Sequence, residues 1–406
     1  MSFMMYDLII LAIFVLVIGG FLYRKRKNLK KEGLLLLYKT SWGIKLINYV
    51  GNKYKRSFKF LSYISVGLGY LLMIGVIWLF YTIVKVYLLR PDVVTVIKVP
   101  PIMPLIPYID KVVPFLPPFY FTYWIIILGV IAITHEFAHG IFAAYNKVKI
   151  NKTGFGFFPF FLPVFLAAFV ELDEKVMVKK PNFGQRAILS AGTFANVITA
   201  IFFFVVLFGF FSLSFSPGGV MFDDYSYSVV DVGSIIMING IAIENPTQEI
   251  LVELIEDASF NEIQTSNRKY MGVKGFSSNG EQIALYDDAP AIKAELNGAI
   301  VEINDEKISN LEELGGVLGK YKVGDQISVK TVMKEETKVY EIELGENPSQ
   351  KGKAWLGVGF LNRENGGLMS KIFATASSFK KANIYYESKI GEFGWFIYYG
   401  GLFLLA

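Results

Sequence analysis

The stretch His135-Glu136-Phe137-Ala138-His139 decides how the rest of the chain is interpreted. On an α-helix, residues four apart lie on one face, so His135 and His139 can offer two imidazole nitrogens to one zinc ion. Glu136 lies beside them, where its carboxylate can take a proton from an activated water and pass it to a leaving amine. These are also the only two histidines in the chain. The pattern predicts a zinc site with Glu136 as general base and then general acid.

The surroundings of this stretch place it in a membrane. Uncharged residues run unbroken from 112 to 134, which is long enough for a membrane span. Ionisable side chains at membrane depth normally face a partner or a water-filled cavity, so they indicate a functional site. The predicted hydrolase is therefore expected to act inside the membrane.

Composition agrees with a membrane protein and excludes several chemistries. Apolar residues make up 53% of the chain and charged residues 18%, an imbalance that long apolar runs explain better than a large soluble core. The absence of cysteine excludes disulfides, thiolate metal sites and a cysteine nucleophile. Positive charge follows the first apolar run and no small-residue cleavage site appears, so this run is expected to be a retained span, not a signal peptide.

Five apolar runs are expected to span the membrane, and the loops between them differ in basic residues. Residues 24–59 hold 12 Lys or Arg, residues 91–118 hold two, and residues 146–186 hold seven. By the positive-inside rule, the first and third loops are cytoplasmic and the second is outside. This places the N-terminus and the region after the fourth span outside, and both histidines toward the cytoplasmic end of their span. The runs are 5–23, 60–84, 119–144, about 187–215, and a fifth from about 393.

Two segments between the spans each have two interpretations. Residues 34–61 mix leucines and Trp42 with lysines, which is typical of an amphipathic element on the cytoplasmic membrane surface or of a solvated linker. Residues 153–170 are apolar but are interrupted by two glycines and two prolines. These breaks favour a re-entrant hairpin or a short sheet at the membrane edge, which could accept an unwound substrate as an added strand. The alternative is a passive anchor at the cytoplasmic interface.

The fourth span carries a polar residue that needs a partner. Small residues around 190–195 give this span a face for close helix packing, and Asn196 adds a buried amide. Two roles are open for Asn196. It can make a plain hydrogen bond to a neighbouring helix, or it can donate to the oxyanion that develops beside the zinc.

A soluble region follows, from about residue 218 to 387, in which strands, turns and dispersed charges alternate. A pattern occurs twice in it, as GSIIMIN at 233–239 and as GAIVEIN at 298–304. Each copy predicts a strand, an Asn-centred turn and a second short strand, followed by a helix that begins at Asn245 or Asn310. The alternative is two unrelated hairpins.

The motif on a membrane helix resembles that of the site-2 protease family of intramembrane zinc metalloproteases. Residues 168–174 (AFVELDE) are similar to a stretch of archaeal-type members, and residues 191–196 (AGTFAN) resemble the family's Ala-Gly-Pro-x-x-Asn. The repeat is similar to the PDZ domains that many members insert after this span. The resemblance covers about residues 119–361 and implies a zinc-dependent protease that cleaves within the membrane.

The sequence departs from the family pattern in two places. Thr193 stands where the family usually has proline. The family's third zinc ligand is an aspartate in a later span, usually followed by glycine, but no Asp-Gly occurs here and no aspartate follows Asp325. A third ligand is therefore not found, and the chain is expected to hold an incomplete zinc site because its fifth span is truncated.

Together these observations predict a zinc metalloendopeptidase that cleaves transmembrane helices of membrane-protein substrates in regulated intramembrane proteolysis. Zn²⁺ would be held by His135 and His139, with Glu136 catalytic and Asn196 in an oxyanion or positioning role. One alternative is a catalytically incomplete membrane scaffold of the same fold. Another is a transporter whose intramembrane histidines and glutamate carry protons or ions.

The expected fold class is a polytopic α-helical membrane protein of about five spans, the last truncated, with an inserted α+β PDZ-like soluble region. The expected partners are a substrate transmembrane helix and the lipid bilayer, with no nucleic acid. The PDZ-like region is expected to be extracytoplasmic and to bind a peptide or a substrate ectodomain, in a multi-pass protein of the cell membrane. The expected segments are 1–59 (first span and basic cytoplasmic segment), 60–118 (second span and Pro-rich extracytoplasmic loop), 119–217 (metalloprotease core), 218–387 (PDZ-like region, in one or two copies) and 388–406 (start of a further span).

Overall fold

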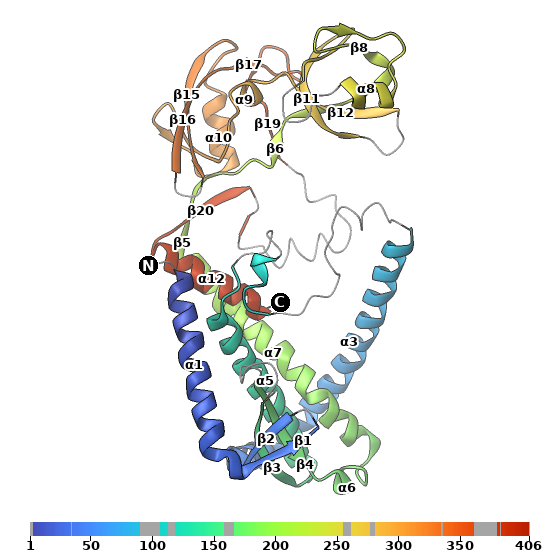
Figure 1. The fold of residues 1–406 in the computed structure, drawn as a ribbon, viewed down its shortest axis with the longest axis vertical. Coiled ribbons are helices and arrows are strands. Elements are labelled where there is room, and N and C mark those ends of the chain that lie inside the picture. Colours follow the sequence, from blue (N-terminus) through green and yellow to red (C-terminus); the bar gives the residue numbers. More distant parts are fainter. Residues whose placement is uncertain are drawn as a thin grey trace. The chain divides into compact units, whose positions relative to one another are not determined.

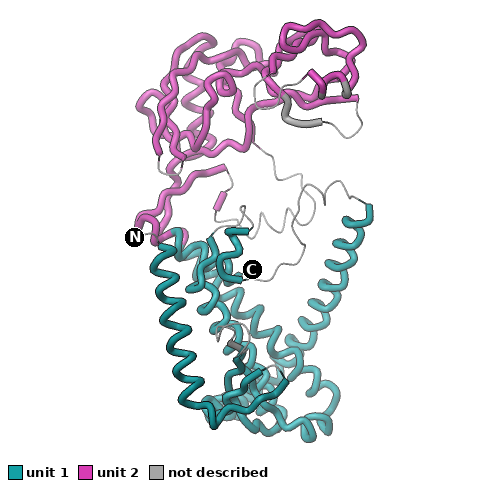
Figure 2. The backbone as a smooth tube through the Cα atoms, viewed as in Figure 1, with its two compact units in different colours: residues 1–210, 395–406 teal, residues 211–394 magenta. Residues whose placement is uncertain are grey.

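The structure is a computed structural model that describes most of the chain. Its described residues form two compact units, unit 1 with residues 1–210 and 395–406 and unit 2 with residues 211–394 (Figure 2). Most of the expected Pro-rich loop at 91–118 lies outside the described residues. The described ranges are 3–33, 35–89, 106–112, 118–157, 166–254, 261–276, 281–333, 336–360, 380–381 and 383–405.

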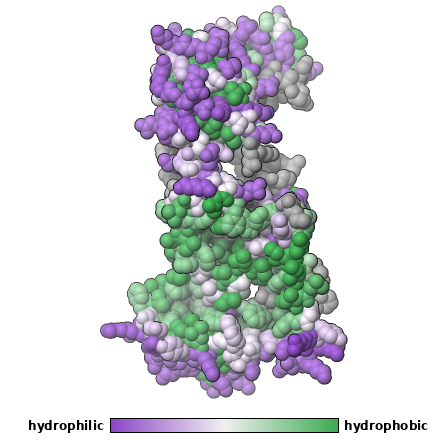
Figure 3. Space-filling model, turned by 90° about the vertical axis from the view of Figure 1, so that its left-hand side faces the viewer, coloured by the Kyte–Doolittle hydropathy of each residue, from purple (hydrophilic) through white to green (hydrophobic). Residues whose placement is uncertain are grey.

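Four helices of unit 1 are long and apolar enough, among the described residues, to cross a membrane (Figure 1). They cover the first four apolar runs that the sequence predicted as spans. A helix suits such segments because it pairs its backbone N–H and C=O groups internally where lipid offers no partner. Figure 3 accordingly shows hydrophobic side chains covering the helical part of unit 1. The helices are α1 (Phe3–Lys25), α3 (Lys55–Leu89), α5 (Phe121–Tyr145) and α7 (Asn182–Ser214).

A shorter helix occupies the position of the fifth apolar run. This helix, α12 (Glu392–Leu405), has 14 residues, fewer than the roughly 20 that a span needs. Its Phe403 ring lies 4.4 Å from the Phe119 ring, between centroids. The Tyr123 hydroxyl donates to the Phe396 carbonyl at 2.6 Å. Helix α12 therefore packs against the start of α5.

A four-stranded antiparallel sheet, in the order β1-β2-β3-β4, lies at one end of these helices (Figure 1). The segment 153–170 thus contributes strands, which confirms the sheet interpretation, while residues 158–165 with both prolines lie outside the described residues. Strand β4 is an edge strand among the described residues, where β3 alone pairs with it. The strands are β1 (Leu29–Glu32), β2 (Leu35–Thr40), β3 (Ile150–Phe157) and β4 (Leu166–Leu172).

A short amphipathic helix, α2 (Ile44–Lys53), connects β2 to α3. Its Ile47 is fully buried against α5. A β-carbon built on Gly51 would overlap the Ile141 carbonyl oxygen and the Ala144 side chain, so the two helix backbones approach closely there. Residues 34–61 therefore include packed elements, so the solvated linker is wrong, while their location on the cytoplasmic membrane surface stays a prediction.

The first helix is tied to the start of α5 by a buried carboxylate. Asp7, only 1% exposed, accepts the N–H groups of Phe121 at 2.8 Å and Thr122 at 2.9 Å. It also accepts the hydroxyls of Thr122 at 2.5 Å and Tyr108 at 2.8 Å. The first N–H groups of a helix have no partner within that helix, and negative charge is favoured at a helix N-terminus. Asp7 of α1 therefore caps α5 from outside the helix.

Unit 2 consists mainly of two larger sheets, each over its own apolar core. One has the order β7-β12-β11-β10-β8-β9. The other has the order β16-β15-β13-β5-β20, with β14 paired to β13. The first sheet comprises β7 (Tyr227–Asp231), β8 (Ile235–Ile238), β9 (Ile241–Ala242), β10 (Ile263–Thr265), β11 (Lys269–Phe276) and β12 (Gln282–Asp287). The second comprises β5 (Phe215–Val220), β13 (Ala299–Ile303), β14 (Glu306–Lys307), β15 (Gln326–Met333), β16 (Glu336–Glu343) and β20 (Ile384–Ser388).

The internal repeat is confirmed by equivalent contacts of its two asparagines. Asn239 has φ 49° and accepts the Glu262 N–H through its side chain at 3.0 Å. Asn304 has φ 46° and accepts the Ser328 N–H at 2.7 Å. Each asparagine thus turns the chain through the left-handed region and clamps the next strand of its own sheet, so the two copies are structurally equivalent there.

The helix starts were predicted correctly in one copy. Asn310 caps α10 (Leu311–Leu318), with its side chain accepting the Glu313 N–H at 2.9 Å. The start predicted at Asn245 is wrong, because α8 (Gln248–Leu254) begins three residues later. Thr247 precedes the helix instead, and its hydroxyl accepts the Ile250 N–H at 3.4 Å, while Asn245 has φ 57°.

One copy of the repeat is inserted into the other. Strand β6 (Asp224–Tyr225) pairs with β19 (Val358–Gly359), whereas β7, which follows β6, pairs with β12. The chain therefore begins in the second sheet with β5, forms the whole of the first sheet from β7 to β12, and continues in the second sheet with β13. This explains why the two copies of the pattern are closer in sequence than two consecutive domains would be.

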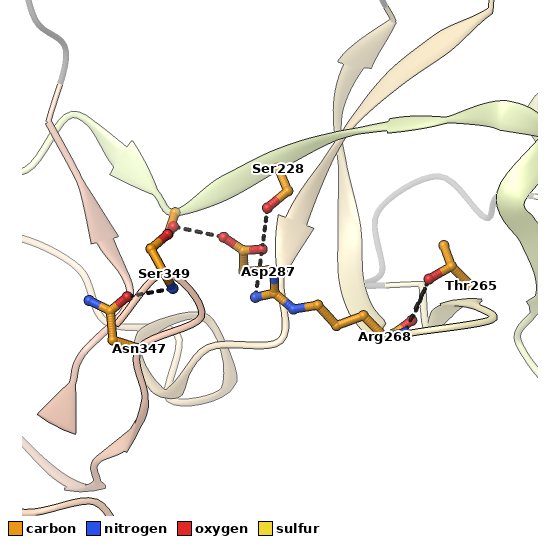
Figure 4. A network of polar contacts seen from close by, with 7 residues as sticks. Ser228, Thr265, Arg268, Asp287, Asn347 and Ser349 are labelled. Atoms are coloured by element: carbon orange, nitrogen blue, oxygen red, sulfur yellow. Dashed lines mark hydrogen bonds and ion pairs between the residues drawn. The ribbon is translucent and has the colours of Figure 1, made fainter. Parts of the chain in front are cut away.

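A buried ionic network lies at the end of β12, where the chain leaves the first sheet (Figure 4). Asp287, at the end of β12 and 2% exposed, accepts the hydroxyls of Ser226 at 2.8 Å and Ser228 at 2.7 Å. The Arg268 guanidinium lies 3.2 Å from the same carboxylate. A buried carboxylate needs such partners to offset its desolvation. These contacts join the end of β12 to the start of β7.

Candidate active site

Helix α5 brings the two histidines and the glutamate of the motif together. It is continuous over 25 residues, so His135 and His139 lie one turn apart on the same face. Their Nε2 atoms are 3.2 Å apart and point toward a common position. Glu136 follows His135 on the same turn.

Helix α7 fixes both imidazole rings. The Nδ1–H of His139 donates to the Ile188 carbonyl at 2.7 Å. The Nδ1 of His135 lies 3.3 Å from the side-chain oxygen of Asn196. A proton on Nδ1 satisfies both contacts and leaves the Nε2 lone pair of each ring free, which is the arrangement that metal-binding histidines show. Asn196 of α7 thus makes a hydrogen bond to His135 of α5. This is the first of the two roles considered for Asn196, a bond to a neighbouring helix.

Gly192 leaves room for the two rings. It lies midway between Ile188 and Asn196 on α7, on the face that meets the histidines. A β-carbon built on Gly192 would overlap Nε2 of both His135 and His139. Only glycine fits this position without displacing a ring or the helix.

The residues present fit a zinc ion. Two nitrogens each about 2.05 Å from a tetrahedral zinc lie about 3.3 Å apart, close to the 3.2 Å that separates the two Nε2 atoms. In the described part of the chain, no third His, Cys, Asp or Glu completes a cluster of three with this pair. His135 and His139 could therefore supply two nitrogen ligands to a zinc ion.

The Glu136 carboxylate lies at the edge of the sheet that β4 forms. The Glu136 side chain accepts the Val170 N–H at 3.0 Å, and Val170 belongs to the edge strand β4. A pocket of about 20 Å³ beside it is lined by Glu136, Phe137 and residues of β3 and β4, including Thr153. This is room for about one water molecule. The general base predicted from sequence is thus held between the histidine pair and a free strand edge.

The sequence matches the model of Peptidase family M50 over residues 123–358, more than half of the chain. The chain belongs to Peptidase family M50. Members of this family are zinc metallopeptidases of membranes, which is the family that the motif on a membrane helix indicated. No curated protein matches the chain significantly.

The M50 match includes strands β3 and β4 of the sheet next to the site, and the other face of this sheet carries an ion-pair cluster. Lys39 of β2 lies 2.9 Å from Glu32 and 2.8 Å from Glu171, which joins β1, β2 and β4. Hydrogen bonds to Glu171 and then Glu32 raise the pKa of the Lys39 ammonium. The cluster borders an open cavity of about 470 Å³ whose lining includes Leu37 and Gly156. Lys39 thus links strands that lie far apart in the sequence.

Several groups that contact the motif residues lie outside the motif, so the motif alone does not indicate them. Sequence analysis did not identify the Ile188 carbonyl or the Val170 N–H, and it gave Gly192 only as one of the small residues for helix packing. The signal that could have found the Ile188 carbonyl and the place of Gly192 is their spacing, because Ile188, Gly192 and Asn196 recur every four residues on one helix face, as the histidines do. Thr193, which replaces the family's proline, donates to the Ser190 carbonyl at 2.9 Å, and α7 continues through it.

Proposed function

We propose that this chain is an intramembrane zinc metalloendopeptidase that cleaves transmembrane helices of membrane-protein substrates, as in regulated intramembrane proteolysis. The observation that carries the proposal is the pair of converging Nε2 atoms of His135 and His139, with Glu136 on the same turn. Membership of Peptidase family M50 supports the chemistry. The location of this pair in a helix apolar enough to cross a membrane supports a substrate that is itself in the membrane.

Each residue of the candidate site has its own role in the proposed peptide hydrolysis. His135 and His139 would hold zinc through Nε2, and the bound ion supplies Lewis-acid activation of a water molecule. Asn196 and Ile188 keep the two rings in the tautomer and orientation that binding requires. Glu136 takes the proton of the attacking water and delivers it to the nitrogen of the leaving amine, first as base and then as acid. Asn196 is therefore a positioning residue in this proposal.

The edge strand β4 offers a way to present an unwound substrate. A helical peptide bond has its backbone groups already paired, so the substrate must become extended near the scissile bond. An extended segment can pair with the open edge of β4, as peptides do when they add a strand to a sheet. Glu136 is bonded to that same edge through the Val170 N–H, so such a segment would lie next to the base.

Substitution of Val170 by proline is expected to reduce cleavage at least tenfold while leaving the sheet folded. Proline removes the N–H that Glu136 accepts, and an edge strand tolerates proline where the N–H points away from the sheet. The preceding residue, Phe169, is already extended, as a residue before proline prefers. The measurement is the rate of substrate cleavage, with folding followed by thermal unfolding.

Ala168→Pro is the matched control, because alternate residues of β4 point their N–H groups to the same open edge. Among the described residues, Glu136 accepts the N–H of Val170, and no hydrogen bond joins it to Ala168. If only strand addition matters, both variants should lose activity equally. A wild-type rate in Val170→Pro would remove this edge from the mechanism.

The proposed activity is tested most directly with the purified full chain in proteoliposomes that contain a transmembrane-helix substrate. Cleavage within the transmembrane segment, identified by mass spectrometry of the products, should disappear with a zinc chelator and return with added zinc. Bound zinc without cleavage of any tested helix would instead favour the catalytically incomplete scaffold.

We also propose that unit 2 is an extracytoplasmic PDZ-like region of a multi-pass cell-membrane protein. The 12, two and seven basic residues in successive loops support this orientation. Cysteines introduced at Lys338 and Lys30 can be labelled individually, because the chain has no cysteine. An impermeant reagent applied to intact cells should label position 338 and not position 30. The reverse result would invert the topology.

A groove in unit 2 supports peptide binding by this region. It lies between α10 and residues 354–360, with a volume of about 180 Å³, and its lining is apolar apart from backbone. Leu314 and Leu318 of α10 face Leu356 and Phe360 across it. An apolar groove beside a helix suits an extended peptide or a substrate ectodomain, which the PDZ-like interpretation predicts.

A further inference from the structure

Helix α2 has an exposed face as distinctive as its buried one. Trp42, just before the helix, is 63% exposed, and Leu46 and Tyr49 on the helix are 57% and 55% exposed. Leu46 and Tyr49 are three residues apart, so they lie along one side of the helix, and Trp42 is exposed just before the N-cap residue Gly43. The side that carries Leu46 and Tyr49 is opposite to the one on which Ile47 packs against α5.

The surroundings of this face are strongly basic. Residues 41–60 contain five Lys or Arg and no Asp or Glu. All five are exposed, and no ion pair found within the described residues involves any of them. They are Lys45, Lys53, Lys55, Arg56 and Lys59. The face therefore has a net positive charge that nothing described in this protein neutralises.

Aromatic side chains hold one of these charges close to the helix. The Lys53 ammonium lies 4.8 Å from the centre of the Tyr49 ring and 5.5 Å from that of Tyr54. Lysine stems lie along apolar surface while the charged end stays at a polar boundary. The Lys53 charge is thus held at the boundary of an apolar row.

The following helix shows where the membrane surface must lie. Helix α3 has 35 residues and a length of about 52 Å, well beyond the roughly 30 Å of the hydrocarbon core. Its charges are concentrated in its first turns, at Lys55, Arg56 and Lys59, and an uncharged run begins at Phe60. The junction of α2 and α3 therefore lies at a membrane surface.

We propose that the α2 face formed by Trp42, Leu46 and Tyr49, with its neighbouring lysines, is a docking surface for anionic phospholipid headgroups. Aromatic and leucine side chains flanked by lysines, without acidic residues, have the composition of a helix that lies in the interface of an anionic membrane. A lipid headgroup supplies the negative charge and its acyl chains cover the exposed aromatic row. This inference does not depend on protease activity.

The docking surface is mechanically joined to the candidate active site. The Trp42 ring lies 5.9 Å from the Phe137 ring, and Phe137 follows Glu136 on α5. A β-carbon built on Gly140, just after His139, would come within 3.0 Å of Ile47 of α2. Lipid docking on α2 would therefore set the position of the half of α5 that carries the motif.

Trp42 itself can report on the contact. The full chain is placed in phosphatidylcholine vesicles that contain a fraction of phosphatidylglycerol, with bromine on the acyl chains of one lipid or the other. The contribution of Trp42 is the quenching that disappears in Trp42→Phe, which separates it from the other four tryptophans. We expect brominated phosphatidylglycerol to quench Trp42 more strongly than the same fraction of brominated phosphatidylcholine.

The lysines are tested with a matched pair of variants. Lys45→Gln/Lys53→Gln should lower the preference for phosphatidylglycerol about fivefold for each lysine. Lys175→Gln/Lys179→Gln removes two exposed lysines that are not part of α2 and should leave the preference unchanged. Equal quenching by both lipids would overturn the proposal. So would quenching of Trp42 by aqueous iodide alone, which shows a face in water, or by neither agent, which shows a face covered by protein.

Discussion

Replacing Glu136 with glutamine is expected to leave zinc bound and to slow substrate cleavage roughly 10²–10⁴-fold, the range that loss of a general acid–base group causes. Glutamine has nearly the same shape, and its side-chain oxygen can still accept the Val170 N–H that Glu136 accepts at 3.0 Å. The position of the side chain at the strand edge is therefore preserved. What is lost is the ability to take a proton from water and return it to the leaving amine. Zinc per chain and the cleavage rate, measured on the same preparation, separate these effects.

The comparison variant is His139→Ala, which removes a proposed ligand and leaves the base in place. It should lose both zinc and activity, because the two Nε2 atoms that converge at 3.2 Å are reduced to one. Full activity in Glu136→Gln would show that another group is the base. Unchanged zinc content in His139→Ala would show that the ion, if present, is held elsewhere.

The motif could be predicted from sequence because all of its geometry lies on one helix. Residues four apart on a helix have a fixed relation, so the convergence of His135 and His139 follows from local structure alone. The same reasoning predicted the long apolar helices, since any apolar segment in lipid must pair its own backbone. These parts of the fold need no knowledge of what lies nearby.

The remainder of the site depends on which helix faces α5, and local sequence does not contain that information. From sequence alone, Asn196 could equally make a hydrogen bond to a neighbouring helix or donate to an oxyanion. The structure places its side-chain oxygen 3.3 Å from Nδ1 of His135. The Ile188 carbonyl is a backbone group, so no side chain marks it in the sequence. Its role appears only because α7 runs antiparallel to α5 and brings Ile188 to His139 and Asn196 to His135.

The small sheet shows the same limit for strands. Gly and Pro breaks in residues 153–170 indicated a hairpin or sheet, and β3 and β4 form it. Strand β2 was not predicted, although it pairs with β3 through Tyr38 and Phe155, more than a hundred residues apart. Its lysine and leucines resemble an interfacial segment, and only a distant partner makes them a strand.

In unit 2 the repeat was detectable and its nesting was not. The asparagine of each copy has a local role, because it turns the chain through positive φ, and that role leaves a pattern in the sequence. The insertion of one copy into the other depends on β6 pairing with β19, two short strands without such a pattern. The Asp287 network at the crossing combines residues from three separate segments.

Gly192 is the position at which the smallest chemical change should have a disproportionate effect. Gly192→Ala adds one methyl group where its β-carbon would overlap the Nε2 atoms of both His135 and His139. Those two atoms are the proposed zinc-binding atoms, so either the rings rotate away from each other or α7 moves off α5. Loss of one supporting hydrogen bond to a metal ligand typically costs 10–100-fold in affinity or activity. Displacement of both ligands should lower zinc affinity at least about a hundredfold.

Gly209→Ala is the matched control on the same helix, because a β-carbon there would have no heavy atom within 4 Å. Alanine is favoured over glycine inside a helix by about 1 kcal/mol, so both variants gain the same helix propensity. Any difference between them therefore comes from the space beside the histidines. We expect Gly209→Ala to keep wild-type zinc content and cleavage, and Gly192→Ala to lose both while its far-ultraviolet circular dichroism stays helical. Stoichiometric zinc in Gly192→Ala would mean that the ion does not occupy the position between the two Nε2 atoms, and the proposed site would have to be abandoned.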